Sequence, residues 1–243
     1  MPKQSSAQRV QPDAAPQLFH HPLCPQSRFA RLALAEYGVE ATLVEENIQD
    51  RRHAFLLLNP ACETPVLQLA EGGALSGAAA IAEYLDETAA AGKIQRLMPT
   101  QPAARAETRR LVDWFGRKFF AEVSGPLVTE KIYRRFLPPA QGGGGPDMER
   151  VRSARANIRP HLRYIGWLAA SRHWLAGETL SLADLAAAAH ISSADYLGDV
   201  PWAEDANAKE WYVRVKSRPS FRALLNDRIA RLPPAGSYAD LDF

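Results

Sequence analysis

Cys24 is the residue best placed for chemistry, because it stands at the start of a predicted helix. The segment 21–27 reads HPLCPQS, and apolar residues at helical spacing predict a helix from about Gln26 to Tyr37. The positive end of a helix favours a thiolate, so a cysteine in this place can act as a nucleophile. The alternative is an inert cysteine that has no thiol substrate. Cys24 and Ser27 are therefore the first candidates for thiol chemistry.

The histidines and cysteines do not indicate a metal or cofactor site. The six histidines show no spacing typical of metal ligands, and His20-His21 is interpreted as the end of a strand. The two cysteines, Cys24 and Cys62, favour a reducing cytosol over a disulfide-stabilised secreted fold. No apolar run reaches the roughly 18 residues of a membrane span. We expect a cytoplasmic protein with no metal, no cofactor and no insertion into a membrane.

Charge is concentrated in one block of the chain. The whole sequence has a net charge of +2, yet residues 105–163 carry 13 Lys/Arg against 6 Asp/Glu, which is +7. Such a block predicts either an acidic partner or a solvated helix face. Nucleic acid is not expected, because no helix-turn-helix, zinc-finger or RRM pattern accompanies the charge.

The order of predicted elements indicates an α/β unit, βαβαββα, at the start of the chain. Strands are expected at 17–20, 41–48 and 65–70, with a short fourth strand after the Gly72-Gly73 turn. Helices are expected at 26–37, 55–60 and 78–92. Gly38 stands where a left-handed helix cap belongs, and Pro60 ends the second helix.

After residue 98 the pattern becomes helical. Helices are expected at 103–136, 148–170, 181–194 and 206–217, with another after Pro219 and a kink or break at Pro160. The segment 137–147, with its glycine run 141–145, is predicted to be a flexible loop. We divide the chain into a disordered leader (1–16), an α/β domain (17–95), a helical domain (100–231) and an extended tail (232–243).

Two short motifs support this organisation. Ser181 and Asp184 fit a capping box, in which each residue bonds the other's backbone at the start of a helix. Thr64-Pro65 lies directly before a predicted strand. The first motif stabilises the start of a helix. The second is weak evidence by itself and indicates a function only if the fold is one in which a proline at this place lies at the active site.

With these elements in place, the sequence resembles the glutathione-transferase superfamily over roughly 17–230. The blocks LALAEYGV, ETPVLQL, AAAIAEYL, LAGETLSLADLAAAA and WYVRVKSRPSF occur in the family's order. The resemblance implies a thioredoxin-like domain followed by a helical domain, a homodimer, and a cis Pro65 facing the active site.

The family's glutathione site is incomplete in this sequence. In the pattern L-x-E-S-x-A-I-x-x-Y-L, the Glu-Ser pair that holds the γ-glutamyl group corresponds to Gly77 and Ala78. Each missing hydrogen bond to a charged group is worth about 1.5–3 kcal/mol, so the pair is worth roughly 10²–10⁴ in affinity. Ser76 replaces them only if the register shifts by two. The resemblance therefore predicts a non-enzyme with Cys24, Ser27 and Pro65 as vestiges of a catalytic site.

Two other functions remain open on the same residues. Cys24-x-x-Ser27 resembles the monothiol motif of omega-type transferases, which implies a glutathione or thiol transferase that uses Cys24. A small-molecule binding module without catalysis is the third option.

The end of the chain, YADLDF, carries a narrower resemblance to the FtsZ-localised transferase-like family of alphaproteobacteria. The segment 130–136 and the missing Glu-Ser pair agree with it. It implies a non-enzymatic homodimer at the division site that binds and shapes FtsZ filaments, promotes constriction, and contacts other division proteins. The alternative is a tail that packs as a strap on its own helical domain. The candidate partner-binding residues are Glu130, Arg134, Tyr238, Asp240, Leu241, Asp242 and Phe243.

Overall fold

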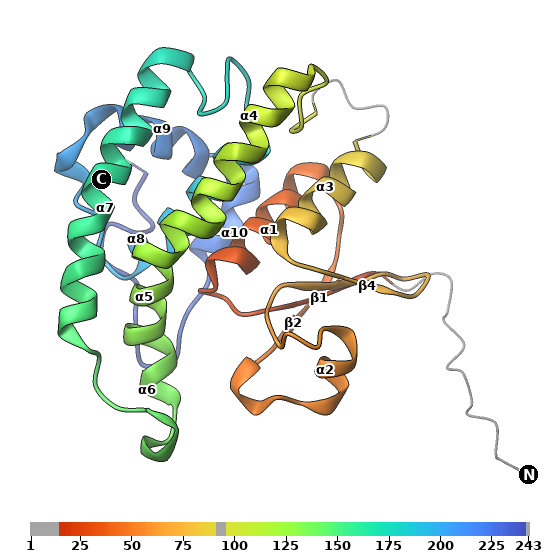
Figure 1. Ribbon diagram of the computed structural model, residues 1–243, viewed down its shortest axis with the longest axis vertical. Coiled ribbons are helices and arrows are strands. Elements are labelled where there is room, and N and C mark those ends of the chain that lie inside the picture. Colours follow the sequence, from red (N-terminus) through yellow and green to blue (C-terminus); the bar gives the residue numbers. More distant parts are fainter. Residues whose placement is uncertain (1–14, 91–95, 242–243) are drawn as a thin grey trace, which may run out of the picture.

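The computed structural model describes residues 15–90 and 96–241 and has two parts (Figure 1). A small sheet with its helices forms one side of the molecule, and a bundle of helices forms the other. The predicted leader and the end of the predicted third helix fall largely outside the described residues, so the boundaries 1–16, 17–95 and 100–231 stay predictions.

The first part has the predicted order of strands and helices. Its elements are β1 (Gln17–His20), α1 (Pro25–Tyr37), β2 (Thr42–Glu45), a 3-10 turn (Ile48–Asp50), α2 (His53–Leu58), β3 (Val66–Gln68), β4 (Ala74–Ser76) and α3 (Ala78–Thr88). Helix α1 ends as predicted at Gly38, whose φ of 64° is left-handed and whose neighbour Val39 donates its amide to Leu34.

The strands form one mixed sheet in the order β2-β1-β3-β4. β1 pairs parallel with β2 and antiparallel with β3, and β3 pairs antiparallel with β4. Because successive side chains point to opposite faces, Leu18 joins the core formed by α1 and α3, while Phe19 packs on Phe55 of α2. The sheet therefore has helices on both faces.

The second part is helical, as predicted. Its elements are α4 (Pro102–Asp113), a π-helical segment (Trp114–Ser124), α5 (Gly125–Val128), a second π-helical segment (Thr129–Tyr133), α6 (Arg134–Phe136), a 3-10 turn (Pro139–Gln141), α7 (Met148–Arg172), α8 (Leu182–Tyr196), a 3-10 turn (Trp202–Glu204), α9 (Ala206–Lys216), a 3-10 turn (Pro219–Phe221) and α10 (Arg222–Leu225).

The helical segments from residue 102 to residue 136 are continuous and form one long helical element, which we call the rod. Helix α7 lies alongside it (Figure 1). The prediction of a break at Pro160 is wrong, since α7 runs from Met148 through Pro160 to Arg172. The proline removes only the amide that would bond the carbonyl of Ala156. Both residues are exposed, so water can satisfy that carbonyl.

Helix α8 is the centre of the bundle, and every residue in it is buried. The predicted capping box is confirmed at its start, where Asp184 accepts the amide (2.9 Å) and the hydroxyl (2.8 Å) of Ser181. Asp184 also accepts the amide of Leu175 and the indole N–H of Trp211, both at 2.9 Å. The motif therefore ties α8 to α9 and to the loop after α7.

Candidate functional site

A cavity of about 870 Å³ lies between the two parts of the molecule. The start of α1, the loop before β3 and the start of α3 line one wall, and the rod lines the other. Apolar groups make up most of its lining. The ion pair Glu83–Arg109 joins the two walls, and the pair Asp113–Arg117 lies within the rod. The cavity is large enough for a small organic ligand.

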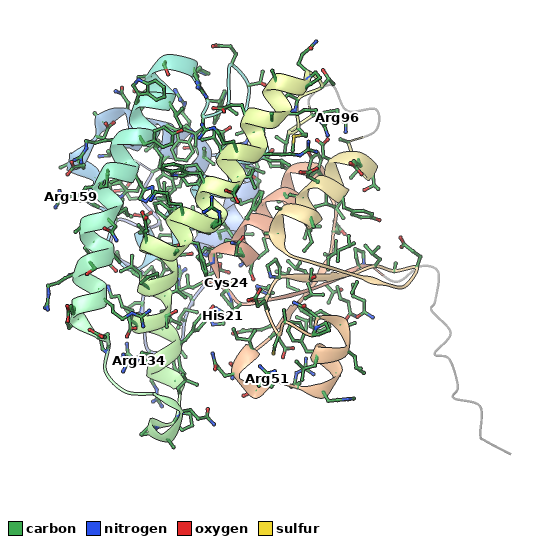
Figure 2. The ribbon with its side chains drawn as sticks, in the orientation of Figure 1. His21, Cys24, Arg51, Arg96, Arg134 and Arg159 are labelled. Carbon is green, nitrogen blue, oxygen red and sulfur yellow. The ribbon has the colours of Figure 1, made fainter. Side chains whose placement is uncertain are left out.

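Cys24 lines this cavity directly before α1, as predicted. Its thiol donates to the carbonyl of Thr64 at 3.7 Å, and the Thr64-Pro65 peptide bond is cis, as the family resemblance implied. Burial, together with the neighbouring Cys24 thiol, raises the pKa of the Tyr133 hydroxyl well above its usual value. Thr64 and Tyr133 therefore both contact Cys24. Figure 2 shows Cys24 between the sheet and the rod.

Ser27 does not join them. It is fully buried, and its hydroxyl accepts the amide of His21 at 3.3 Å. Ser27 therefore supports the loop that carries Cys24, and among the described residues it is not part of the cavity lining.

The positions expected to hold a γ-glutamyl group offer no side-chain hydrogen bond. Gly77 directly precedes α3 with φ 89°, where a larger side chain would be strained, and Ala78 is buried. Ile81 and Leu85 of the same helix are buried in the core, which fixes the register and leaves Ser76 on β4. Gly77 and Ala78 thus add no side-chain donor or acceptor to this edge of the cavity, where Ser76 is also a lining residue.

Arg28, which the sequence analysis did not single out, forms a joint between the two parts. It is fully buried and donates to the Pro22 carbonyl (2.7 Å), Ser192 (2.8 Å), Tyr238 (2.8 Å) and Asp227 (3.1 Å). Burial lowers the pKa of Arg28, but Tyr238 and Asp227 outweigh it and the pKa is raised. The sequence offered one sign of this role, because Arg28 is a charged residue among the apolar residues of α1.

A second arginine completes the joint. Arg31 binds both carboxylate oxygens of Asp227, at 2.8 and 3.0 Å. We use "the joint" for Arg28, Arg31, Ser192, Asp227 and Tyr238. It connects α1, α8, the segment after α10 and the tail in one network.

The tail packs on its own domain at Tyr238, so the strap alternative is confirmed there. Tyr238 is fully buried in a cluster with Leu23 and Ile132, and its hydroxyl donates to the carbonyl of Leu224 at 3.0 Å. Tyr238 is therefore enclosed by its own chain, and its role in partner binding stays a prediction. The ammonium of Lys216 binds the main-chain carbonyl of Asp240 at 2.8 Å.

Two of the tail residues predicted to bind a partner lie at the surface of the described chain. Asp240 is exposed, and Leu241 is 39% exposed. Asp242 and Phe243, which were also predicted to bind a partner, lie outside the described residues.

Glu130 is buried as well, and its predicted role in partner binding stays a prediction. Its carboxylate accepts from Arg134 (2.7 Å), Arg150 (2.7 Å) and the amide of Asp147 (3.0 Å). Burial raises the pKa of Glu130, but these donors outweigh it and the pKa is lowered. Glu130 therefore positions Arg134, which lies at the lower end of the rod (Figure 2). Arg134 also donates to the carbonyl of Gly142 in the glycine-rich loop.

Within 15–90 and 96–241, no set of three or more His, Cys, Asp or Glu side chains is arranged to hold a metal ion. In the same ranges, every helix is too short or too polar to cross a membrane.

Comparison with known proteins places this fold and cavity in a family. Residues 23–88 match the model of the glutathione S-transferase N-terminal domain, and residues 146–219 match that of the C-terminal domain. The chain belongs to the glutathione S-transferase family, and the predicted fold is confirmed.

Individual relatives span nearly the whole chain. FtsZ-localized protein A of Caulobacter vibrioides is 44% identical over 229 residues, which are 93% of this chain and 97% of that protein. The crystal structure of a glutathione S-transferase from Sinorhizobium meliloti has a TM-score of 0.92 at 51% identity, covering 95% of this chain and all of that one. The structure of FzlA from C. crescentus has a TM-score of 0.86 at 42% identity, with 95% and 100% coverage. The predicted resemblance to FtsZ-localised proteins is therefore confirmed.

Proposed function

We propose that this protein is a homodimeric adaptor that binds and shapes FtsZ filaments at the cytoplasmic division site and has no glutathione-dependent activity. The observation that carries the proposal is its 44% identity, over 97% of the relative's length, to a protein named FtsZ-localized protein A. A dimer would present two equal filament-binding surfaces and could bridge or bend filaments. Other division proteins are further candidate partners.

The cavity supports the non-enzymatic half of this proposal. Gly77 and Ala78 supply no side-chain oxygen or nitrogen at the edge where the family holds the γ-glutamyl group. Glycine also relieves the strain that a φ of 89° imposes on other residues. Weak or absent glutathione binding follows from these two positions.

The filament-binding surface is proposed at the free end of the tail and at the lower end of the rod. Tyr238 and Ile132 share one buried cluster, so the tail is anchored beside the segment that leads to Arg134. Beyond this anchor, Asp240 and Leu241 are exposed. Asp242 and Phe243 continue the same segment in the sequence.

A thiol transferase that uses Cys24 is the second candidate. It is supported by the position of Cys24 in the cavity beside Thr64 and Tyr133, and by the 51% identity to a structure described as a glutathione S-transferase. A thiol transferase would have to bind its thiol substrate in the cavity, whereas the adaptor would not.

The test pairs two binding measurements on the full chain. We expect the protein to pellet with FtsZ assembled by GTP but not with FtsZ kept in GDP. We also expect calorimetry to find glutathione binding weaker than the micromolar range. Pelleting that fails, together with micromolar glutathione binding and thiol exchange at Cys24, would replace the adaptor by the enzyme.

A further inference from the structure

The outer face of α7 carries a row of arginines that ends in a tryptophan. Arg155, Arg159, Arg163 and Trp167 are spaced four residues apart, so they lie along one side of the helix. We call these four residues the ridge. Figure 2 shows Arg159 on the outer side of α7, away from Cys24 and the cavity. The ridge is therefore separate from the surfaces discussed above.

Two carboxylates hold the arginines of the ridge in place. Asp199 binds Arg155 at 2.6 Å and also Lys131 at 2.6 Å. Glu204 binds Arg159 at 2.5 Å and also Arg163. Each carboxylate is shared by two cations, so each group of three keeps a net positive charge. The guanidinium groups are thereby positioned without being neutralised.

The arginines nevertheless remain accessible. Their side chains are 47% (Arg155), 53% (Arg159) and 57% (Arg163) exposed. Ala156 and Pro160, also exposed, stand between them on the helix and add little bulk. A partner segment can therefore approach the helix closely.

Trp167 gives one end of the ridge an apolar anchor. It is 59% exposed and lies nearly parallel to Tyr164, with ring centroids 6.2 Å apart. The guanidinium of Arg172 lies 5.8 Å from the centre of its ring. Exposed tryptophan beside arginine is the composition that dominates binding energy in protein interfaces.

The spacing indicates the kind of partner. Four residues of an α-helix rise about 6 Å, so the three arginines offer one positive group per turn over about 12 Å, and Trp167 follows about 6 Å further on. Carboxylates one turn apart on another helix have the same spacing. Single-stranded nucleic acid would call for several stacking aromatics along the groove, whereas the exposed ridge carries one.

We propose that the ridge binds an acidic helical segment of a partner protein, whose carboxylates pair with the arginines and whose apolar end packs on Trp167. This goes beyond the proposed function and does not depend on it. A protein with this second surface could hold a filament and another protein at once.

The probe is a fluorescein-labelled helical peptide. It carries glutamates four residues apart, and a leucine stands four residues after the last glutamate. Fluorescence anisotropy measures its binding to the full chain. A second peptide of the same composition has its glutamates placed on different helix faces. We expect the first peptide to bind and the second to bind at least tenfold more weakly.

Two sets of variants separate the contribution of the arginine charges to peptide binding from that of Trp167. Arg159→Glu combined with Arg163→Glu should weaken peptide binding at least about thirtyfold and reduce its dependence on salt. Trp167→Ala should weaken it about tenfold with the salt dependence unchanged. Arg222→Glu is the matched control, because Arg222 is exposed on α10, and it should change binding less than threefold.

A circular-dichroism melt checks that each variant is folded, and Arg159→Gln with Arg163→Gln serves if the charge reversal unfolds the chain. Equal binding of both peptides would overturn the proposal. So would an unchanged affinity in the folded ridge variants, or tighter binding of a single-stranded oligonucleotide than of the acidic peptide.

Discussion

The joint around Arg28 and the cavity edge at Gly77 lie between the same two parts of the molecule and are built in opposite ways. At the joint, buried charges have several partners each, and Arg28 alone donates four hydrogen bonds. At the cavity edge, Gly77 and Ala78 offer none from their side chains. The chain's buried polar groups thus hold its parts and its tail together.

Under the proposed function, this difference shows how the family's scaffold is kept without glutathione binding. The core positions around the cavity edge, such as Ile81 and Leu85, are still filled and buried. The tail is fastened to that scaffold through Tyr238, which leaves its last residues at the surface. The proposed adaptor function requires the joint and does not require a ligand in the cavity. Substitutions at the joint should therefore cost more stability than substitutions at the cavity.

Removal of the buried cation at the joint should have the largest effect. Arg28→Met keeps the volume but leaves the Pro22 carbonyl and Tyr238 without their shared donor. We expect the free energy of unfolding to fall by about 3–5 kcal/mol in urea denaturation, as when one partner of a buried pair is lost. Arg117→Met at the cavity, where the pair with Asp113 is exposed, should change it by less than about 0.5 kcal/mol. Equal losses would break the comparison.

Acid should have the next largest effect, at His21, which lies close enough to Arg28 of the joint to feel its charge. Burial, and then the charge of Arg28, lower the pKa of His21 to about 4 from 6.5, so the folded state holds this histidine neutral. The unfolded chain takes up the proton first, so this stability is complete above pH 6.5 and is lost as the pH falls towards 4. Between pH 7 and 5 the loss from this histidine is about 2 kcal/mol.

The variant His21→Asn tests this assignment. Asparagine can still accept the amide of Leu23, which the ring of His21 accepts at 3.2 Å. We expect its unfolding free energy to fall about 1–2 kcal/mol less than that of the unaltered protein over the same pH range. An identical pH slope in both proteins would remove His21 from the account.

Loss of the tail's anchor should cost less. Tyr238→Phe removes only the hydroxyl that joins Arg28 to the carbonyl of Leu224. We expect a loss of about 1 kcal/mol in unfolding free energy. Hydrogen exchange should also quicken in the tail before it does in α8. An unaltered tail and melting profile would show that ring packing alone holds the strap.

At the cavity, Cys24→Ala should have the smallest effect. The thiol makes a long hydrogen bond to Thr64 at 3.7 Å and a contact with the Tyr133 hydroxyl, so the stability change should be about 1 kcal/mol. Filament pelleting should be unchanged. Lost pelleting with an unaltered melt would mean that thiol chemistry at Cys24 matters after all.

The predictions from sequence succeeded where the signal is local. Gly38, the Ser181–Asp184 box and the apolar periods each fix a helix end or a helix face within a few residues. They failed where the outcome depends on distant partners. The sequence does not predict the burial of Glu130 and Tyr238. Glu130 is buried in an ion pair with Arg150, and Tyr238 is buried in a hydrogen bond with Arg28, and neither partner is a near neighbour in the sequence. Pro160 was expected to kink or break its helix. Whether water reaches the carbonyl that a proline leaves unbonded depends on the packing of the whole bundle, which the local sequence does not reveal.

The most direct test of the account is the pelleting of the Asp240→Lys variant with GTP-assembled FtsZ. Asp240 lies beyond the Tyr238 anchor and is exposed, and its charge also acts on Lys216, so a circular-dichroism melt and a sizing column first check that the variant is folded. Glu178→Lys, an equally exposed charge reversal before α8, is the control. We predict at least a thirtyfold loss of filament affinity for Asp240→Lys, equal to about 2 kcal/mol and enlarged by avidity in a dimer, and none for the control. Normal pelleting by folded Asp240→Lys would contradict the assignment of the tail as the filament-binding surface.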